Sequence, residues 1–360
     1  KSHGFFALDR RARFYHQVSA DALAPAVTSF LTAERVEQAG VAHDTRRLRL
    51  FSGTSNQALA REIGAYLGVP DGPRVIKRFA DGELYIQIQE SIRGCDVFLI
   101  QPTCAPVNDH LMELLIMVDA CKRASARQIT AVVPYYGYAR ADRKTAGRES
   151  ITAKLVANLL AKSGVDRVLA MDLHSAQIQG YFDIPVDPLD SHAVFIPYLE
   201  NLKLENLTFA APDVGATNRI REIASYFNAE MVICDKHRKR ANEIASMVVI
   251  GDVTDRDVVI IDDICDTGGT LAKSAGMLKD KGARSVRALI THPVLSGKAY
   301  ENIENSVLEI TAFRNIATAS LTVNTLLKFL YKFKTYYPSL YQLGSQVEVN
   351  KEIKKEIDNV

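Results

Sequence analysis

From residue 48 to about residue 173, short apolar segments alternate with amphipathic ones. The apolar segments have the length of strands and carry too few polar residues to alternate between a buried and an exposed face. They are LRLF (48–51), DVFLIQ (96–101), QITAVVPYY (128–136) and DRVLAMDL (166–173). Such strands, separated by amphipathic helices, are typical of a parallel sheet that is covered on both faces.

Three helices are predicted between these strands. The segment NQALAREIGAYLG spaces its apolar residues by three or four positions and stops at Gly68, a residue type that commonly ends helices. Asn108 or Asp109 can cap a second helix, which is predicted through HLMELLIMVDACKRAS. A third helix is predicted over ITAKLVANLLAKSG and ends at Gly164.

The alternation restarts at residue 207, which indicates a second unit of the same kind. Its expected strands are LTFAAPD, EMVICDK, VVIGDV, DVVIID and SVRALITH, and its expected helices are ATNRIREIASYFN and TLAKSAGMLKDKG. Two successive units predict an α/β protein with two similar domains, each a mostly parallel sheet flanked by helices. The expected parts are an extension outside the fold (1–45), an N-terminal domain (46–192), a C-terminal domain (193–335) and a charged tail (336–360).

Composition narrows the classes of partner. The 360 residues carry a formal net charge of only +2, which argues against general nucleic-acid binding. No apolar segment reaches the length needed to span a membrane, so we expect no membrane partner. The five cysteines are scattered, odd in number and lack C-x-x-C spacing, which favours a reduced, intracellular chain without a zinc site.

The stretch IIDDICDTGGT (260–270) places carboxylates and a glycine turn at the end of a predicted strand, where open parallel sheets bind ligands. The turn consists of Thr267, Gly268, Gly269 and Thr270, and the carboxylates are those of Asp262, Asp263 and Asp266. Converging backbone N–H groups, hydroxyls and the N-terminus of the next helix can together cradle a phosphate. Ionised acids instead accept hydrogen bonds from vicinal sugar hydroxyls. We therefore interpret the stretch as a sugar-phosphate site, in preference to an acidic turn with a helix cap.

A histidine follows another predicted strand end. In VLAMDLHSAQIQGYFDIPVD, His174 lies two residues after Asp172, with Asp183 and Asp187 further on. A neutral imidazole at this place can bind a divalent metal or a polyphosphate. A lone histidine is more often a satisfied structural residue, and these residues alone leave both interpretations open.

Three further stretches suit a nucleotide triphosphate, although each has a plainer interpretation. RFADGE (78–83) offers the ring of Phe79 for stacking, or simply a β-turn at Asp81-Gly82. YYGYARADRKTAGRES (135–150) is a cationic loop whose guanidinium groups match phosphate geometry, or a solvated basic loop. DKHRKR (235–240) places Lys236 and Arg238 where they can neutralise charge in phosphoryl transfer, or forms a surface turn.

The stretch 260–270 has the residue pattern of the phosphoribosyl-pyrophosphate (PRPP) loop of type I phosphoribosyltransferase folds, and neither a P-loop nor a G-x-G-x-x-G motif occurs. Together with TCAPVNDHLMELLIM and PDVG, the five stretches resemble the ribose-phosphate diphosphokinase family from about residue 48 to residue 310. The resemblance implies two type I phosphoribosyltransferase-like domains. It also implies Mg²⁺-dependent transfer of the pyrophosphoryl group of ATP to the 1-hydroxyl of ribose 5-phosphate, which gives PRPP and AMP for nucleotide biosynthesis.

The resemblance further implies a role for each matching residue. The ribose 5-phosphate residues are Asp262, Asp263, Asp266, Thr267, Gly268, Gly269 and Thr270, and the pyrophosphate loop is Asp213, Val214 and Gly215. The ATP-site residues are Phe79, Asp81, Glu83, Arg140 and His174. His174 and Asp213 resemble the Mg²⁺-site residues, and Lys236 and Arg238 resemble the mobile-loop cations that stabilise the transition state.

The resemblance implies a cytoplasmic homo-oligomer, a hexamer built from dimers. Two other functions remain open. A salvage phosphoribosyltransferase shares the 260–270 pattern, but the duplicated α/β unit, the Arg140 loop and Lys236 favour the diphosphokinase. A catalytically silent, regulatory member of the same family is disfavoured by the presence of His174, Asp213 and Arg238.

Overall fold

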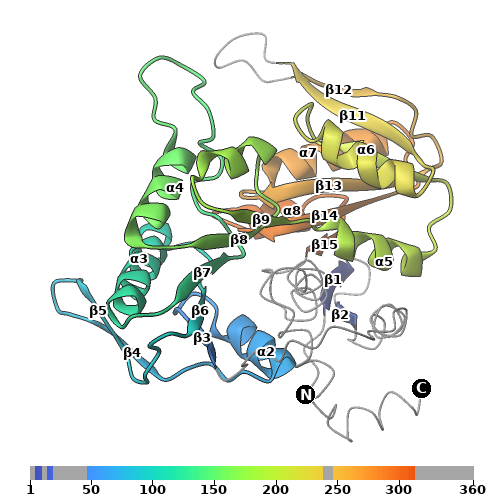
Figure 1. Cartoon of the computed structure of the whole chain (residues 1–360). Coiled ribbons are helices and arrows are strands. Elements are labelled where there is room, and N and C mark those ends of the chain that lie inside the picture. Colours follow the sequence, from blue (N-terminus) through green and yellow to red (C-terminus); the bar gives the residue numbers. More distant parts are fainter. Residues whose placement is uncertain (1–4, 10–13, 19–46, 238–245, 313–360) are drawn as a thin grey trace, which may run out of the picture. The chain divides into compact units, whose positions relative to one another are not determined.

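A computed structural model describes residues 5–9, 14–18, 47–237 and 246–312 of the chain (Figure 1). The described residues fall into two compact units that divide between Ser191 and His192. The N-terminal unit comprises residues 47–191. The C-terminal unit comprises residues 192–237 and 246–312, together with the two short segments near the start of the chain. The charged tail predicted at residues 336–360 lies outside the described residues.

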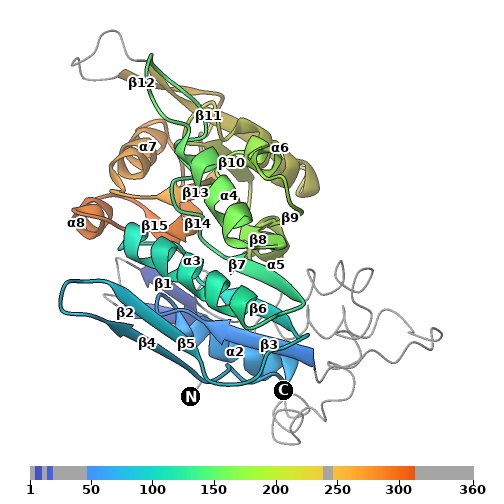
Figure 2. The ribbon, with the colours of Figure 1, turned by 60° about the vertical axis from the view of Figure 1, so that its left-hand side comes forward.

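The N-terminal unit is built around a five-stranded parallel sheet with the order β3-β6-β7-β8-β9. Its strands are β3 (Leu48–Ser52), β6 (Asp96–Ile100), β7 (Gln128–Val133), β8 (Arg167–Met171) and β9 (Val186–Leu189). Its helices are α2 (Gln57–Leu67), α3 (Val107–Arg123), α4 (Thr152–Ser163) and the short 3₁₀ helix η3 (Ala176–Tyr181). A separate antiparallel hairpin is formed by β4 (Arg74–Arg78) and β5 (Leu84–Ile88), and β5 packs against α3 (Figure 2).

Both faces of this sheet are buried, as the continuous apolar strands predict. Val97 and Leu99 of β6 belong to an apolar cluster with Leu114 of α3 and Val156 of α4. Ile100 points to the opposite face and joins the cluster that includes residues of α2. Each fully buried leucine contributes roughly 1.5–3 kcal/mol to folding relative to an exposed one, so burial on both faces stabilises the sheet. Because its strands run parallel, their C-terminal ends lie at one edge.

The predicted start of α3 was wrong. The helix begins at Val107, directly after Pro106, so Asn108 and Asp109 lie inside its first turn instead of capping it. Proline suits a helix start because its φ angle is already helical and the missing N–H group has no helical partner there. By contrast, α2 has the expected ends: Asn56 accepts a hydrogen bond from the N–H group of Leu59 at 3.1 Å, and Gly68 ends the helix with a φ of 65°.

The C-terminal unit is built around an eight-stranded sheet with the order β12-β11-β10-β13-β14-β15-β1-β2. Its strands are β10 (Leu207–Ala211), β11 (Glu230–His237), β12 (Ser246–Ile250), β13 (Asp257–Cys265), β14 (Ser285–Pro293) and β15 (Glu309–Ala312), with β1 (Phe5–Asp9) and β2 (Phe14–Val18). Its helices are α5 (His192–Leu202), α6 (Thr217–Tyr226), α7 (Gly269–Asp280) and α8 (Ala299–Glu304). Five neighbouring strands, β11, β10, β13, β14 and β15, run parallel, and β12, β1 and β2 are antiparallel to their neighbours.

Two segments of the expected N-terminal extension take part in this sheet. We expected residues 1–45 outside the fold, but β1 pairs with β15 and β2 pairs with β1. The last parallel strand of a sheet offers unpaired N–H and C=O groups, which an additional strand can satisfy. The weak periodicity of this part of the sequence gave no sign of such pairing.

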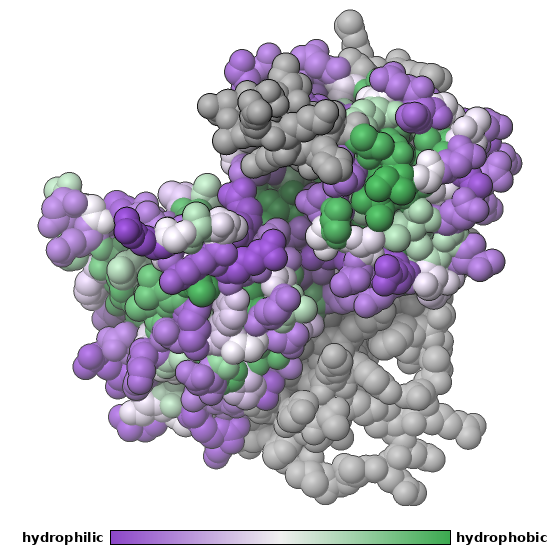
Figure 3. All heavy atoms as spheres, turned by 90° about the horizontal axis from the view of Figure 1, so that it is seen from above, coloured by the Kyte–Doolittle hydropathy of each residue, from purple (hydrophilic) through white to green (hydrophobic). Residues whose placement is uncertain are grey.

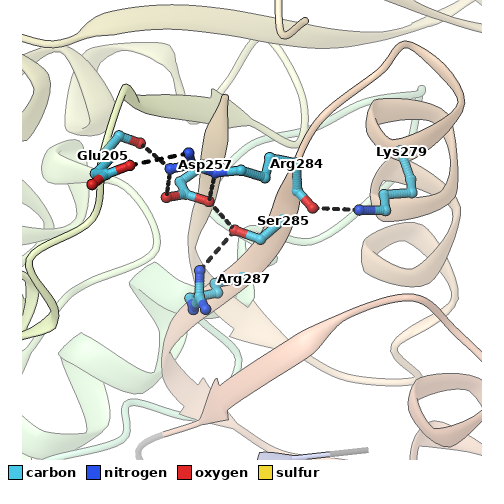
Figure 4. A network of polar contacts seen from close by, with 6 residues as sticks. All are labelled: Glu205, Asp257, Lys279, Arg284, Ser285 and Arg287. Carbon is cyan, nitrogen blue, oxygen red and sulfur yellow. Dashed lines mark hydrogen bonds and ion pairs between the residues drawn. The ribbon is translucent and has the colours of Figure 1, made fainter. Parts of the chain in front are cut away.

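The edge of the C-terminal sheet at which β13 and β14 begin is held by a polar network (Figure 4). The buried carboxylate of Asp257 accepts hydrogen bonds from Nε of Arg284 at 3.1 Å and from Oγ of Ser285 at 2.6 Å. Arg284 also donates to the main-chain oxygen of Glu205, at 3.0 Å. The hydrogen bonds from Arg284, and after them the one from Ser285, hold the pKa of Asp257 below its ordinary value of 3.8.

This network predicts a pH-dependent part of the stability. Because the folded pKa of Asp257 is depressed, its contribution is complete above the unfolded pKa and is lost as the pH falls through 3.8 towards the folded pKa. We expect Asp257→Asn to lower the free energy of unfolding at neutral pH and to flatten its decrease between about pH 5 and pH 3. Urea unfolding across this range measures both effects. Asp255→Asn, at an exposed aspartate of the preceding turn, is the control. Equal pH profiles for the two variants would contradict the assignment.

Candidate active site

Two of the three carboxylates of the predicted sugar-phosphate site, those of Asp262 and Asp263, lie near the C-terminal end of β13. This strand continues to Cys265, which pairs with Pro293 of β14, so Asp262 and Asp263 lie within the strand and not after it. The predicted strand end was therefore three residues short, because the apolar pattern stops before the ladder to β14 does. Asp266 follows directly in the turn and is partly exposed.

The turn from β13 to α7 has the backbone that the glycine pattern predicts. Gly268 has a φ of 71°, a left-handed conformation that favours glycine, and a Cβ atom there would lie 3.2 Å from Cγ1 of Ile303. The carbonyl group of Gly268 accepts the first helical bond of α7, from the N–H group of Ala272 at 2.9 Å. No side chain caps this helix start, which leaves its first N–H groups suited to a phosphate.

The loop after β14 and the helix α8 that follows it support the turn. Nδ2 of Asn302 donates to the main-chain oxygen of Thr267 at 2.8 Å, and the N–H group of Ser296 donates to that of Asp266 at 2.9 Å. Sequence reasoning missed both residues, because neither belongs to a charged or glycine-rich motif. Thr267 is exposed, whereas Gly269 and Thr270 are half-buried at the start of α7.

Asp262 and Asp263 differ in their surroundings. The N–H group of Asp263 donates to Oδ1 of Asp262 at 3.0 Å, and Oδ1 of Asp263 forms an ion pair with Nη1 of Arg219 at 3.1 Å. Burial raises the pKa of Asp262 well above its ordinary value, and the adjacent Asp263 carboxylate raises it further. The pair places two carboxyl groups side by side, where both can accept hydrogen bonds from sugar hydroxyl groups.

The predicted pyrophosphate loop lies beside this acid pair. It follows β10, which pairs in parallel with β13 (Ala210 opposite Ile260), so both strands end at the same edge of the sheet. Oδ1 of Asp213 accepts a hydrogen bond from the N–H group of Ala216 at 3.0 Å, just before α6. Val214 is exposed, and a Cβ atom on Gly215 would lie 3.1 Å from the Asp213 carboxylate. The negative charge of Asp213 also raises the pKa of Asp262.

Of the two predicted transition-state cations, the structure describes Lys236, which lies on β11. Lys236 lies on β11 opposite Met247 of β12, one residue before the strand ends. β11 runs parallel to β10, with Ile233 opposite Ala211. Lys236 therefore lies beyond the end of β10, at the edge of the sheet where the Asp213 loop begins. Arg238 lies outside the described residues. The predicted roles of both cations stay predictions.

In the N-terminal unit, the RFADGE stretch forms the loop of the β4–β5 hairpin. The ring of Phe79 is 55% exposed and meets Tyr85 edge to face, with 6.3 Å between ring centroids. Oδ1 of Asp81 accepts a hydrogen bond from the N–H group of Glu83 at 3.1 Å. The turn interpretation of this stretch is confirmed, and stacking on the exposed ring of Phe79 stays a prediction.

The first turn of α3 contacts two of the predicted ATP-site segments. Nη2 of Arg78 forms an ion pair with Asp109 at 3.0 Å, while Nη1 of Arg78 donates to the main-chain oxygen of Gly82 at 2.8 Å. The hydroxyl of Tyr138 donates to Oδ1 of Asn108. The helix start thus holds both the hairpin loop and the loop that leads to the exposed Arg140.

His174 is exposed in the segment between β8 and η3, as expected for a residue at a strand end. The nearby carboxylates contact residues other than His174. Asp187 forms an ion pair with Arg167 at 2.5 Å, and the exposed Asp183 lies 3.9 Å from Lys154. Oδ1 of Asp172 lies 3.4 Å from the N–H group of Ser191. These positions weaken the argument that neighbouring aspartates form a metal site with His174.

Comparisons with known proteins agree with this architecture. The N-terminal domain of ribose phosphate pyrophosphokinase matches residues 48–164, and the phosphoribosyl transferase domain matches residues 194–319. A ribose-phosphate pyrophosphokinase of Parasynechococcus marenigrum is 68% identical over 77% of this chain and 84% of its own length. That of Synechocystis is 56% identical over 79% of this chain and 86% of its own.

A solved structure is also similar over most of the chain. It is the phosphoribosylpyrophosphate synthetase of Mycobacterium smegmatis, with a TM-score of 0.73 and 34% identity, covering 79% of this chain and 99% of that one. The two α/β units predicted from the apolar pattern are thereby confirmed as the fold. This chain belongs to the ribose-phosphate pyrophosphokinase family.

Proposed function

We propose that the chain transfers the β,γ-pyrophosphoryl group of ATP to the 1-hydroxyl of ribose 5-phosphate, which gives PRPP and AMP. The observation that carries the proposal is the site at the end of β13. There, two adjacent acids precede a Gly268 turn and an uncapped helix start, within a chain of this family. This arrangement suits a ligand with a diol at one end and a phosphate at the other.

The acceptor is oriented from both ends. The carboxyl groups of Asp262 and Asp263 bind the sugar hydroxyls, while Thr267, Thr270 and the first N–H groups of α7 bind the 5-phosphate. Asp266 borders the turn. Held in this way, the 1-hydroxyl faces the neighbouring loop of Asp213, where the transferred group is placed. Positioning of this kind supplies much of the rate in phosphoryl transfer.

The reaction forms a bond between the 1-oxygen of the sugar and the β-phosphorus of ATP, and it breaks the bond from that phosphorus to the oxygen that stays with AMP. Lys236 and Arg238 neutralise the charge that develops on the transferred group. Phe79 stacks on the adenine, with Asp81, Glu83 and Arg140 contacting the nucleotide. None of these side chains needs to form a covalent bond with a substrate.

The donor atoms near the site suit Mg²⁺. This ion prefers carboxylate, phosphate and water oxygens, and the carboxylate of Asp213 stands in an exposed loop at the pyrophosphate end of the site. When bound, Mg²⁺ offsets the negative charge of the phosphates. His174 offers a nitrogen, a weaker ligand for this ion, so we assign it to the polyphosphate as well as to the metal. The two residues belong to different units, and their roles are therefore tested separately.

The partners follow from the same proposal. Within the described residues no helix combines the length and the apolarity required to cross a membrane. All five cysteines are free thiols, in keeping with a reducing compartment such as the cytoplasm.

The surface in Figure 3 is largely hydrophilic with a few apolar patches, and exposed aliphatic side chains occur on α4 (Leu155, Leu159) and β12 (Val248, Ile250). We propose that such side chains are buried in a homo-oligomer, a hexamer built from dimers.

An assay of the purified chain tests the proposed activity. With ATP, Mg²⁺ and ribose 5-phosphate we expect AMP to form only when all three are present. If no AMP forms, the proposal fails. Consumption of PRPP with a nucleobase would then favour a phosphoribosyltransferase, and inactivity in both assays would favour a regulatory member of the family.

A further inference from the structure

Arg219 stands where a helix ordinarily disfavours a cation. It lies in the first turn of α6 (Thr217–Tyr226), and that turn contains no acidic residue. The N-terminal end of a helix carries a partial positive charge, so an arginine there lowers the stability of the helix unless another group compensates for it. Local rules of this kind are most often broken at functional sites.

The compensating group is Asp263. Nη1 of Arg219 lies 3.1 Å from Oδ1 of Asp263, and the two side chains are only 19% and 7% exposed. An ion pair that is this well buried has a defined geometry, because either charge left alone would be strongly unfavourable. The positive charge of Arg219 also lowers the pKa of Asp262, whereas the charges of Asp263 and Asp213 raise it. Arg219 is therefore a cation in contact with Asp263 whose charge also reaches Asp262.

We propose that Arg219 is a positioning residue that orients the Asp263 carboxylate toward the sugar hydroxyls of ribose 5-phosphate. The inference rests on the proposed function, since it assigns Asp263 to the sugar. A guanidinium group fixes the plane of a carboxylate through its own planar array of donors. It also reduces the repulsion between the three acids and the doubly charged phosphate of the ligand. Arg219 itself need not contact the sugar.

Direct binding of ribose 5-phosphate tests the proposal. We would titrate the sugar into the protein by calorimetry with Mg²⁺ and α,β-methylene ATP, an analogue that cannot transfer its pyrophosphoryl group. We expect Arg219→Gln to raise the Kd for ribose 5-phosphate about 10- to 100-fold, which is the range for losing one hydrogen bond to a charged group. The Kd for the ATP analogue should stay within about twofold of its original value. Arg219→Lys, which keeps the charge, should restore part of the affinity.

A matched control separates positioning from general destabilisation. Arg256→Gln removes another partly buried ion pair of the same unit, to Glu230 at 2.9 Å, and should leave the Kd for ribose 5-phosphate unchanged. A double-mutant cycle of Arg219→Gln with Asp263→Asn should be strongly non-additive for this Kd. Unchanged sugar affinity in Arg219→Gln, or equal loss of affinity for both ligands, would overturn the inference.

These outcomes remain distinct from those of the proposed function. Formation of AMP by the unchanged chain together with normal sugar binding by Arg219→Gln would refute only the positioning role. Weakened binding in Arg219→Gln without AMP formation by the unchanged chain would support the positioning role and refute the proposed reaction.

Discussion

Replacing Asp263 with asparagine is expected to raise the KM for ribose 5-phosphate about 100-fold while the KM for ATP changes little. Asparagine keeps the shape of the side chain and an oxygen for Arg219, but it removes the negative charge that accepts hydrogen bonds from the sugar. Because Asp263 is buried within β13, the isosteric change is preferable to alanine, which would remove the oxygen that Arg219 contacts as well as the charge and would leave a cavity. Steady-state kinetics with each substrate varied in turn measures the effect.

The control for this experiment is Asp280→Asn, at the exposed end of α7 and thus on the helix that follows the site. It should leave both KM values unchanged. Equal increases in the KM for ATP and for ribose 5-phosphate in Asp263→Asn would contradict the assignment of Asp263 to the sugar.

The second large effect is expected at Lys236. We predict that Lys236→Ala lowers kcat about 100- to 1,000-fold and changes both KM values less than about threefold, since a cation that acts on developing charge contributes mainly to the transition state. Lys236 lies near the C-terminal end of β11, at the same edge of the sheet as the Asp213 loop. Pre-steady-state measurement of AMP formation would show whether the chemical step is the one that slows.

A lysine outside the site provides the comparison. Lys281→Ala alters an exposed residue directly after α7 and should leave kcat unchanged. A kcat for Lys236→Ala equal to that of the unchanged chain would remove Lys236 from the mechanism.

The sequence was most informative where burial acts on both faces of a strand. Apolar segments such as DVFLIQ and DVVIID predicted the parallel strands, and Gly68 and Gly164 predicted helix ends, because each depends on local chemistry. Elements with mixed composition were not predicted. The strands β4 and β5 were not predicted, although a turn at Asp81-Gly82 was one of two interpretations of the stretch between them, and β1 and β2 depend on pairing with the distant β15.

The site was predicted as a set of motifs, and its connections were not. The acids and the turn of residues 262–270 could be found because they are contiguous and follow an apolar strand. Arg219 could not be found in this way, since its partner Asp263 is distant in sequence. The one local sign was a basic residue in the first turn of a predicted helix, after PDVG, where an acid is usual. The sequence predicts Asn108 or Asp109 as a cap, because nothing in it indicates Tyr138 and Arg78 as their partners.

The fate of the individual phosphates of ATP tests the central claim most directly. ATP carrying radioactive phosphorus at either the β or the γ position would be incubated with ribose 5-phosphate and Mg²⁺, and the products separated. Transfer of the pyrophosphoryl group as a unit predicts that both labels appear in PRPP and neither in AMP. Label from the γ position alone in the sugar product, with β-labelled ADP as the other product, would contradict the account.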